Sequence, residues 1–592
     1  MADETPIIRN LLYLCTPKKN VMAERIEYKE GKVAYRFLDL FAGAGGISEG
    51  FLQAEEDNKY FDFVLASDIN DNCELTHLVR YNFQLGLNTV FHRQDIMEED
   101  FLKNLLEKLN GEQIDVVTGG PSCQSFSLSG RRKQYDKRDD LFEHYLKVIR
   151  VLKPKYFVME NVKGLLTKDG GKIKERIIKE IRSLVDEEEV YQLTEFIAKL
   201  KKSKATEKVF ILDCYQQKID LEVSVEDKNI FNEKYIQTIE NHFKLITKKV
   251  DYKVSKSDVN INTIRHGLNL LKRISILNGI KQSLVNEKTQ SDIDNDGFVD
   301  QFNEFISFIS ESQIIENIAS AFNKINSFEA YKSQVNEILE ALKIYTSTLD
   351  ECFDEMRELI KSNELLDEYE TILNNIRLYN IEKPIVVNSS DYGVPQNRRR
   401  AVIIGKRDGE APALPIKTGQ RVTIWDAIGD LAYLESGEGQ EEQQYAELPA
   451  SDYAKSLRGD MCVLHNHVAT KHSKLALERL ALIPPNCGKE VLPDEHLTKS
   501  IYSGTWSRMI KDDISVTITT RFDTPSSGRF THPYLNRAIT VREAARIQSF
   551  PDSFIFTGTK SSQMKQVGNA VPPRLANAIA TVIKKDMEDD EL

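Results

Sequence analysis

The stretch YRFLDLFAGAGGISEGF, residues 35–51, joins an apolar run to a glycine-rich turn and then to a segment with helical periodicity. A strand that turns through glycines into a helix is typical of the first unit of a parallel α/β sheet. Gly43, Gly45 and Gly46 allow a tight bend and the close approach of a nucleotide-like ligand. Because Ser48 replaces the third glycine of a dinucleotide fingerprint and no Lys-Ser/Thr pair follows, a P-loop is excluded and a dinucleotide site is weakened. On these residues alone, a structural turn and a cofactor site are equally supported.

The same pattern repeats further along the chain. The apolar runs FVLASD (63–68), IDVVTGG (114–120) and YFVMEN (156–161) alternate with amphipathic helical segments. Such alternation indicates βαβ units and a parallel sheet covered on both faces. The predicted fold class is therefore α/β, with a Rossmann-like, mostly parallel sheet.

The length of 592 residues exceeds one ordinary core and predicts several domains of about 150 residues each. No proline occurs between Pro154 and Pro384, and a 3.6-residue periodicity runs through much of this stretch. We therefore expect a large α-helical insertion over residues 171–383. The last residues, 586–592, are expected to form a frayed acidic tail.

Bulk composition narrows the class of protein. Apolar residues make up 41% and charged residues 29% of the chain, and no apolar run reaches the roughly 18 residues that a membrane span needs. The start MADETPIIRN lacks the features of a secretory signal, so we expect a cytoplasmic, nucleoid-associated protein without a membrane partner. The seven cysteines are scattered without a CxxC pair, which argues against a disulfide framework and a zinc site. A net charge of −12 argues mildly against non-specific binding of nucleic acid.

Two acidic residues follow neighbouring strands of the predicted sheet. Asp68 ends the run FVLASD, where a carboxylate can accept hydrogen bonds from both hydroxyls of a ribose. Together with the glycines it favours an adenosine-containing ligand. Asp95, in FHRQDI, follows a third short strand and could meet an adenine amino group, although an isolated Asp there is also typical of a helix cap.

The stretch VVTGGPSCQSFS, residues 116–127, places Cys123 after a Gly-Gly-Pro turn at the carboxyl end of a strand. This edge of an α/β sheet is where ligands bind and catalytic groups collect. A buried, inert cysteine is the ordinary alternative, but polar neighbours and the basic run GRRKQYDKR favour a nucleophile and a polyanionic substrate. Glu160 ends another strand on the same edge, where burial should raise its pKa and let it carry a proton near neutrality.

The segment QNRRR, residues 396–400, repeats polar and cationic side chains at alternate positions. In an extended strand Gln396, Arg398 and Arg400 would share one face, towards a phosphate or a base, and Arg399 would face away. A solvated basic strand is the alternative interpretation.

One acidic segment resembles a calcium loop. In DIDNDGFVDQFN, residues 292–303, Asp292, Asp294 and Asp296 have the spacing of EF-hand ligands. Position twelve is Asn303 rather than a bidentate glutamate, and no second loop accompanies it. We therefore interpret the segment as a solvated turn between helices and expect no metal site.

Several segments, in this order, resemble the motifs of the cytosine-5 DNA methyltransferases: DLFAGAGGISEGF, GGPSCQSFS, ENVKGL, QNRRR, REAARIQSFPDSF and QVGNAVPP. The resemblance covers residues 35 to 170 and 385 to 585 of the sequence. Each motif alone is weak evidence, but the ordered set is very specific. It implies an enzyme that binds S-adenosylmethionine and methylates C5 of a cytosine in a short sequence of double-stranded DNA.

The resemblance also implies how the chemistry is divided among the residues. Cys123 would add to C6 of the cytosine while Glu160 donates a proton or a hydrogen bond at N3, which makes C5 nucleophilic. Arg398 and Arg400 would contact the base and nearby phosphates. Because the ring faces lie inside the duplex, the base must be flipped out, at a cost of about a few kcal/mol. Further contacts to the DNA are implied for Gln124, Ser125, Arg131, Arg132 and Gln396.

Cofactor contacts and the division of the chain follow from the same resemblance. The implied cofactor-binding residues are Phe41, Gly43, Gly45, Gly46, Asp68, Ile69, Asp95 and Asn569. Arg542 and Glu543 would brace the second lobe, in which GTWSRMIKDDISVTITTRF offers aromatic and cationic side chains to a DNA groove. The final helix is expected to lie beside the first strand. The expected parts of the chain are an N-terminal extension (1–34), a first catalytic part (35–170), the helical insertion (171–383), the arginine motif (384–405), a target-recognition domain (406–535), a last catalytic part (536–585) and the acidic tail.

Two features depart from the family pattern. Ser122 stands where members usually have a proline before the nucleophile, which bears on the geometry of the loop and on the rate. The long insertion separates Glu160 from Gln396, and partner binding, dimerisation, extra DNA contact or mere elaboration would all fit it.

The setting and the rival functions stay open at this point. The resemblance implies a prokaryotic or phage modification enzyme, with a cognate restriction endonuclease or a protein bound by the insertion as candidate partners. The rivals are methylation of cytosine in RNA, a catalytically silent DNA-binding protein and a nicotinamide-dependent oxidoreductase. The oxidoreductase is disfavoured because hydride transfer needs neither the nucleophile nor the arginine set.

Overall fold

The computed structural model describes residues 33–54, 59–121, 140–202, 208–223, 347–360, 363–498 and 504–590, with a few helical residues between 234 and 344. The chain divides into two compact units. Unit 1 holds the described residues up to 121, 140–168 and 380–590, and unit 2 holds those between 169 and 379. The finer division into parts that the sequence suggests stays a prediction.

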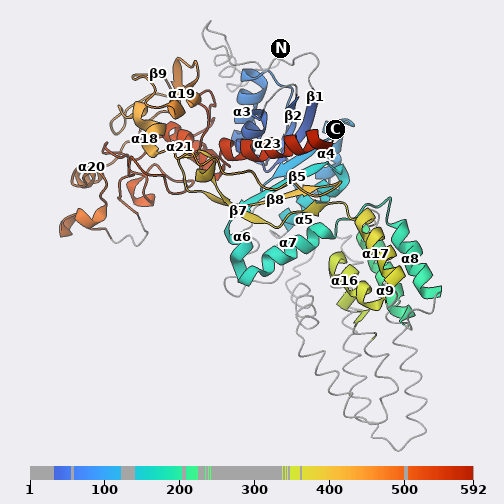
Figure 1. The fold of residues 1–592 in the computed structure, drawn as a ribbon. Coiled ribbons are helices and arrows are strands. Elements are labelled where there is room, and N and C mark those ends of the chain that lie inside the picture. Colours follow the sequence, from blue (N-terminus) through green and yellow to red (C-terminus); the bar gives the residue numbers. More distant parts are fainter. Residues whose placement is uncertain are drawn as a thin grey trace, which may run out of the picture. The chain divides into compact units, whose positions relative to one another are not determined.

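Unit 1 is built on an eight-stranded sheet in the order β3-β2-β1-β4-β5-β8-β6, with β7 paired to β8 (Figure 1). All pairs from β3 to β5 are parallel, and β8 runs antiparallel to β5, β6 and β7. The predicted α/β class with a mostly parallel sheet is therefore confirmed. The strands are β1 (Val33–Leu40), β2 (Lys59–Ser67), β3 (Val90–His92), β4 (Val116–Gly119), β5 (Tyr156–Val162), β6 (Asn380–Ile381), β7 (Ile385–Asn388) and β8 (Arg399–Lys406).

The helices of unit 1 follow the strands as the alternating pattern predicts. The nearly continuous apolar character of the middle strands arises because the sheet is covered on both faces. A small second sheet pairs β9 (Glu442–Gln444) with β10 (Val463–His465). The helices are α2 (Gly46–Leu52), α3 (Asp71–His77), α4 (Phe101–Leu109), α5 (Asp140–Leu152), α6 (Gly164–Thr167), α18 (Ile424–Ile428), α19 (Asp452–Arg458), α20 (Lys474–Ala481), α21 (Val541–Ile547), α22 (Lys560–Asn569) and α23 (Pro573–Asp590).

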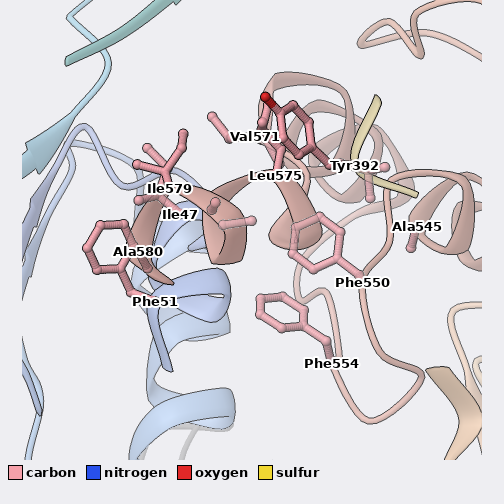
Figure 2. Close-up of a cluster of buried hydrophobic side chains, with 14 of the residues drawn as sticks. Ile47, Phe51, Tyr392, Ala545, Phe550, Phe554, Val571, Leu575, Ile579 and Ala580 are labelled. Atoms are coloured by element: carbon pink, nitrogen blue, oxygen red, sulfur yellow. The ribbon is translucent and has the colours of Figure 1, made fainter. Parts of the chain in front are cut away.

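The last helix of unit 1 packs on the first. Gly50 of α2 lies so close to α23 that a Cβ on it would stand 2.4 Å from both the Pro573 carbonyl oxygen and the Ala576 Cβ. Apolar side chains from both helices, among them Phe51 and Leu575, fill the contact (Figure 2). The last helix thus lies on α2, the helix that directly follows β1, close to its expected place beside the first strand.

The end of α23 differs from the frayed tail that the sequence suggests. The helix continues to Asp590, and Lys406 of β8 pairs with Asp586 at 2.9 Å and with Asp590 at 2.8 Å. The hydroxyl of Tyr156 donates a hydrogen bond to Asp586. Fraying was expected because the segment is acidic, but these carboxylates meet a largely buried lysine on the sheet, so residues 586–590 are helical.

Buried ion pairs hold α21 against the preceding region. Glu543 accepts two hydrogen bonds from Arg537, at 2.8 and 2.7 Å, and the Nε of Arg537 donates to the Leu434 carbonyl. Arg542 donates to the carbonyl of His465, which lies on β10. All of these charged side chains are fully buried, and such pairs are strongly destabilising to break. These contacts tie α21 to the segments around Leu434 and His465, and the expected role of Arg542 and Glu543 in bracing a second lobe stays a prediction.

The described part of unit 2 is helical. Its helices are amphipathic, with isoleucine, leucine and aromatic side chains buried between them and lysine–glutamate pairs at the surface, such as Lys179 with Glu351 at 2.8 Å. The two chain segments that bound the unit lie side by side, since Val185 and Arg377 form an antiparallel bridge. The helices are α7 (Lys172–Arg182), α8 (Tyr191–Lys202), α9 (Val209–Val223), α16 (Leu349–Leu359) and α17 (Asn363–Ile376).

The close contact of α2 with α23 predicts that a methyl group added at Gly50 destabilises the fold. We expect Gly50→Ala to lower the free energy of unfolding by about 1–3 kcal/mol, since overpacking outweighs the helix propensity gained. Gly164→Ala is the matched control, because a Cβ at Gly164 would meet no atom within 4 Å. Urea denaturation of both variants checks the prediction, and equal stability of the two would contradict it.

Two buried histidines predict a loss of stability in acid. His467 and His532 are fully buried, and burial lowers their pKa values to about 4 and about 3. Below a pH of about 6.5 these histidines bind protons in the unfolded chain but stay neutral in the folded protein. The free energy of unfolding therefore falls as the pH drops towards 4. The loss is roughly 1 kcal/mol per histidine for each pH unit.

The variant His467→Gln separates this cause from other acid effects. A glutamine can still contact the two present partners of the ring, the Thr540 hydroxyl and the Leu431 carbonyl, but it does not titrate. Thermal unfolding of both proteins between pH 7.5 and 5 should show a shallower dependence in the variant. Parallel curves would mean that His467 is not a source of the acid sensitivity.

Candidate active site

The glycine turn after β1 is held in an unusual conformation. Phe41 has a φ of 56°, a left-handed value that costs a bulky residue on the order of 1–3 kcal/mol. Two hydrogen bonds fix the turn, from the Ala42 amide to the Ser67 carbonyl at 3.0 Å and from the Gly45 amide to the Ala42 carbonyl at 2.8 Å. Residues held in this way cluster at ligand sites, so the turn is a candidate for binding.

The three glycines of the turn have different surroundings. A Cβ on Gly45 would stand 2.4 Å from the Tyr81 hydroxyl, and one on Gly46 would stand 2.2 Å from the Val571 carbonyl oxygen. These two positions need glycine because of packing within the protein. Only Gly43 faces open space, with a φ of 54°. The predicted cofactor contacts of all three stay predictions, and Gly43 is the one with room for a ligand.

Asp68 is tied to this turn by its carboxylate. One oxygen accepts the Gly43 amide at 2.9 Å and the other accepts the Asn70 amide at 3.0 Å. Burial raises the pKa of Asp68, while these amide donors favour the charged form. An ionised carboxylate has about four acceptor positions, so lone pairs are left for hydroxyl groups. The next residue, Ile69, is an apolar side chain that is 66% exposed. The pair fits a ribose and the flat base attached to it.

The other two residues expected at the cofactor lie on the same edge. Asp95 follows β3 and accepts the Met97 amide at 3.0 Å within a turn. The N-terminal cap of the next helix, α4, is Asp100, so Asp95 is not the helix cap that was the alternative interpretation. The second carboxyl oxygen of Asp95 is not used in the bond to Met97. Asn569 at the end of α22 has an exposed side chain, and its carbonyl accepts a hydrogen bond from Arg398 at 3.0 Å. Neither arrangement tests the predicted contact with the cofactor.

Glu160 lies at the carboxyl end of β5 with its charge partly compensated. The Nε of Arg400 stands 2.6 Å from its Oε1, an ion pair without a well-aligned hydrogen bond, and both side chains are 13% exposed. Burial raises the pKa of Glu160, and the charges of Arg400 and Arg398 act against that rise. A Cβ on Gly120 would stand 3.2 Å from Oε2, so the carboxyl lies against the Gly-Gly-Pro turn. Glu160 is therefore a largely buried acid whose pKa is raised.

The Gly-Gly-Pro turn is fixed by a residue that the sequence reasoning passed over. The side-chain amide of Asn161 donates a hydrogen bond of 2.7 Å to the Pro121 carbonyl, and both groups are buried. The signal was present, because Asn161 stands directly after Glu160 in the strand end ENV. The residues that follow the turn lie outside the described residues, so the structure does not place Ser122, Cys123, Gln124, Ser125, Arg131 or Arg132.

The arginine motif enters β8 with alternating exposure. Arg398 is fully buried and donates to the Asn569 carbonyl at 3.0 Å and to the Ile518 carbonyl at 3.3 Å. Burial, with the charge of Arg400, lowers the pKa of Arg398 to about 9, so the group stays charged at neutral pH. Arg399 is exposed, as predicted for the opposite face. The predicted alternation is confirmed.

Gln396 lies in a place that does not favour its predicted contact with DNA. Its side chain is fully buried, its amide donates to Gln548 at 2.8 Å, and its oxygen accepts the Ile518 amide at 2.7 Å. Both ends of the side chain are therefore used within the protein. Gln396 joins the arginine motif to the segment around Ile518, and its DNA contact stays an untested prediction.

The aromatic and cationic side chains expected in a DNA groove are partly unavailable. Trp506 is 6% exposed and Phe522 is fully buried. Arg508 is 3% exposed and donates to backbone carbonyls, including those of Leu480 and Leu535. Each of these three side chains lies in the interior of the protein and offers no surface to a groove, while contact of the segment with DNA stays a prediction. In the same segment Arg521 is exposed.

A buried acid beneath the glycine turn was also missed. Asp39 of β1 is 1% exposed and accepts hydrogen bonds of 2.6 Å from the hydroxyls of Ser48 and Thr118. Burial raises its pKa to about 6. The three residues join β1, α2 and β4 directly below the turn. A charged residue within the apolar run FLDLF was the available signal.

The described part of the chain offers neither a metal site nor a membrane-spanning helix. Within it, no group of three or more His, Cys, Asp or Glu side chains could hold a metal ion. The acidic segment 292–303 lies outside the described residues. Of the helices that the structure describes, none is both long enough and apolar enough to cross a membrane.

Comparison with known proteins gives two relatives along most of the chain and a third along about one third of it. Type II methyltransferase M.XorII of Xanthomonas oryzae is 26% identical over 572 residues, which cover 93% of this chain and 84% of that protein. M1.HphI of Haemophilus parahaemolyticus is 23% identical and covers 93% and 86%. M.DdeI of Desulfomicrobium norvegicum is 33% identical over 233 residues, which cover 35% of this chain and about half of that protein, 55%.

The family model described as C-5 cytosine-specific DNA methylase matches residues 35–266 and 355–585. These two ranges make up most of the chain and include Glu160 and the arginine motif. The chain therefore belongs to the C-5 cytosine-specific DNA methylase family and is an enzyme of the DNA (cytosine-5-)-methyltransferase class.

Proposed function

We propose that this protein transfers a methyl group from S-adenosylmethionine to C5 of a cytosine that is flipped out of a specific short DNA sequence. The observation that carries the proposal is the buried Glu160, paired with Arg400 and set against the turn that leads to Cys123. This brings a proton-bearing acid and a cation to the edge of the sheet where the candidate nucleophile follows. The glycine turn and Asp68 occupy the same edge.

Each of the proposed catalytic residues has one role in the reaction. The Cys123 thiolate forms a covalent bond to C6 of the cytosine, and Glu160 holds a proton at N3, so the electrons of the C5–C6 double bond become available at C5. S-Adenosylmethionine, when bound, supplies an electrophilic methyl group. A base then removes the proton from C5, and the C6–sulfur bond breaks to release Cys123. Arg398 and Arg400 hold the base and neighbouring phosphates, since guanidinium groups suit both.

The cofactor is held by the turn after β1 and the ends of β2 and β3. Asp68 accepts hydrogen bonds from the ribose hydroxyls, Ile69 packs on the adenine and Asp95 accepts from the adenine amino group. Phe41 and Gly43 lie beside the amino-acid part, where Asn569 also contributes. Gly45 and Gly46 support the turn from the inner side, because their missing side chains let Tyr81 and Val571 approach.

The substrate and setting follow from the relatives. M.XorII and M.DdeI are named Type II methyltransferases, so we propose that this enzyme modifies DNA in a restriction–modification system, with a cognate endonuclease as its partner. The region 406–535 reads the DNA sequence, and the insertion between Glu160 and Gln396 binds a partner or extends the DNA contact. Gln124, Ser125, Arg131 and Arg132 are proposed to contact the DNA.

The proposal predicts new methylation in a host that lacks it. DNA from such a host expressing the protein should carry 5-methylcytosine in one short sequence context, and the Cys123→Ala variant should give none, because the covalent bond to C6 cannot form. Cys352→Ala is the matched control and should keep activity, since Cys352 is buried in α16 of unit 2 and reaches neither DNA nor a partner. Base-resolution sequencing for 5-methylcytosine makes the measurement.

Other outcomes would redirect the proposal. Methylation that persists in Cys123→Ala would exclude the covalent mechanism. If soluble wild-type protein leaves DNA unmethylated, its activity on transfer RNA should be measured, and activity there alone would replace the DNA substrate by RNA. Inactivity on both would favour a silent DNA-binding protein.

The cofactor assignment predicts a loss of affinity in Asp68→Asn. The variant keeps one oxygen for a backbone amide but loses a charged acceptor for the ribose, so the affinity for S-adenosylhomocysteine should fall about tenfold or more. Asp71→Asn is the matched control, because Asp71 is exposed in the first turn of α3. Titration calorimetry measures both. Equal affinities in the two variants would remove Asp68 from the cofactor site.

A further inference from the structure

The turn after β4 continues beside the last residues of β5. The ladder between these two parallel strands ends at the pair Gly119 and Met159. One residue further, a Cβ on Gly120 would stand 3.4 Å from the Glu160 carbonyl oxygen, so the two chain segments stay close. The next residue is Pro121, which has no amide hydrogen. The backbone ladder therefore cannot continue through the amide of Pro121.

The side chain of Asn161 holds the chain at this point. Its Nδ2 donates a hydrogen bond of 2.7 Å to the Pro121 carbonyl, and its Oδ1 accepts the Val162 amide at 2.9 Å. Because a carbonyl needs a donor and an amide N–H needs an acceptor, the two ends of the side chain cannot be exchanged. Asn161 is 7% exposed and Pro121 is buried, so the bond is shielded from water.

The carbonyl that Asn161 binds belongs to the peptide bond between Pro121 and Ser122. A proline at position 122 would restrict the chain here in two ways, since proline fixes its own φ and keeps the preceding residue out of the helical region. Ser122 imposes neither restriction. Cys123, the proposed nucleophile, is the next residue. The peptide plane from which the segment with Cys123 starts is therefore held by a hydrogen bond rather than by a proline ring.

We propose that Asn161 is a positioning residue for the methyl transfer, which acts on Cys123 through the Pro121 carbonyl and supplies the restraint that a proline at position 122 would give. The inference rests on the proposed covalent role of Cys123. Asn161 directly follows Glu160 in β5, so one strand end carries the acid and also orients the turn that leads to the nucleophile. A shift of about 1 Å in a reacting group can lower a rate about 100-fold, so this bond bears on the rate.

The first test removes the hydrogen bond. Asn161→Ala leaves the Pro121 carbonyl without its donor, so kcat for methyl transfer to DNA should fall on the order of 10- to 100-fold. The KM for DNA and the affinity for S-adenosylhomocysteine should stay near their wild-type values, because Asn161 is not proposed to contact either ligand. Steady-state kinetics and titration calorimetry measure these quantities. A wild-type kcat, or a rise in KM in place of the loss of kcat, would overturn the inference.

Asn577→Ala is the matched control. The side-chain amide of Asn577 also donates to a backbone carbonyl, that of Gly50 at 3.3 Å, but it lies in α23, which carries none of the proposed catalytic groups. The variant loses a comparable hydrogen bond, and its kcat should match that of the wild type. An equal loss of kcat in both variants would indicate a general effect of lowered stability and would contradict the role of Asn161.

The second test restores the restraint in another way. Because a proline at position 122 would restrict the same peptide bond, Ser122→Pro should recover most of the kcat that Asn161→Ala loses. Ser122→Pro alone should change kcat little, since the hydrogen bond already holds the turn. Independent substitutions change kcat by factors that multiply, whereas coupled ones depart from the product. If the two factors simply multiply, the proposed compensation is wrong.

A readout without activity is the exchange of amide hydrogens in the turn. Loss of the bond from Asn161 lets the turn open more often, so the peptide that covers residues 116–123 should exchange faster in Asn161→Ala than in the wild type or in Asn577→Ala. Mass spectrometry of proteolytic peptides measures these rates, and equal rates in the three proteins would overturn the inference. Should Asn161→Ala fail to fold, Asn161→Val removes the same donor with a residue that favours strands.

The two proposals can fail separately. Unchanged kcat and unchanged amide exchange in Asn161→Ala, in an enzyme that methylates DNA, would reject the role of Asn161 and leave the function intact. Faster exchange in Asn161→Ala, in a protein whose wild type transfers no methyl group to DNA, would reject the function and keep the anchoring of the turn by Asn161.

Discussion

The contact between α2 and α23 is the constraint on which the rest of unit 1 depends. Gly46 and Gly50 let α2 lie against the carbonyl groups of Val571 and Pro573, closer than any side chain would permit. This contact covers the sheet face that carries Glu160 and fixes the end of α22, where the Asn569 carbonyl meets Arg398. The glycine turn, the acid and the arginine motif are therefore held in one geometry by a helix pair that contains none of the catalytic groups.

Two buried glutamates show how the fold assigns opposite tasks to the same side chain. Glu543 receives two hydrogen bonds from Arg537 in a closed interior, and its pKa is lowered to about 2. Glu160 has Arg400 beside it, but burial against apolar residues prevails and its pKa is raised. The first is a permanent anion that joins segments of the chain. The second can exchange a proton, which the proposed chemistry requires.

Much of the fold was legible in the sequence because it depends on local patterns. The strands around Phe37, Val117 and Phe157 are nearly continuous apolar runs, and alternation in QNRRR predicted which arginines turn inward. What could not be predicted depends on partners distant in the chain. The sequence offered Trp506 and Arg508 as side chains for a DNA groove. Both are buried, because the exposure of a side chain is set by the tertiary packing around it, which a local pattern does not show. The prediction that the acidic end frays was wrong for the same reason. Lys406, whose ion pairs hold Asp586 and Asp590, is distant in the sequence.

The pairing of α2 with α23 also bears on how the chain reaches its native state. Asn577 donates a hydrogen bond to the Gly50 carbonyl, and 527 positions separate the two residues. Contacts of such sequence separation form late and slow the search for the native topology. During synthesis, the apolar face of α2 stays uncovered until the segment of α23 has left the ribosome, at about 5–20 residues per second. At that rate a nascent chain of this enzyme is exposed to aggregation for roughly half a minute to nearly two minutes, and its folding should depend on chaperones that shield apolar surface.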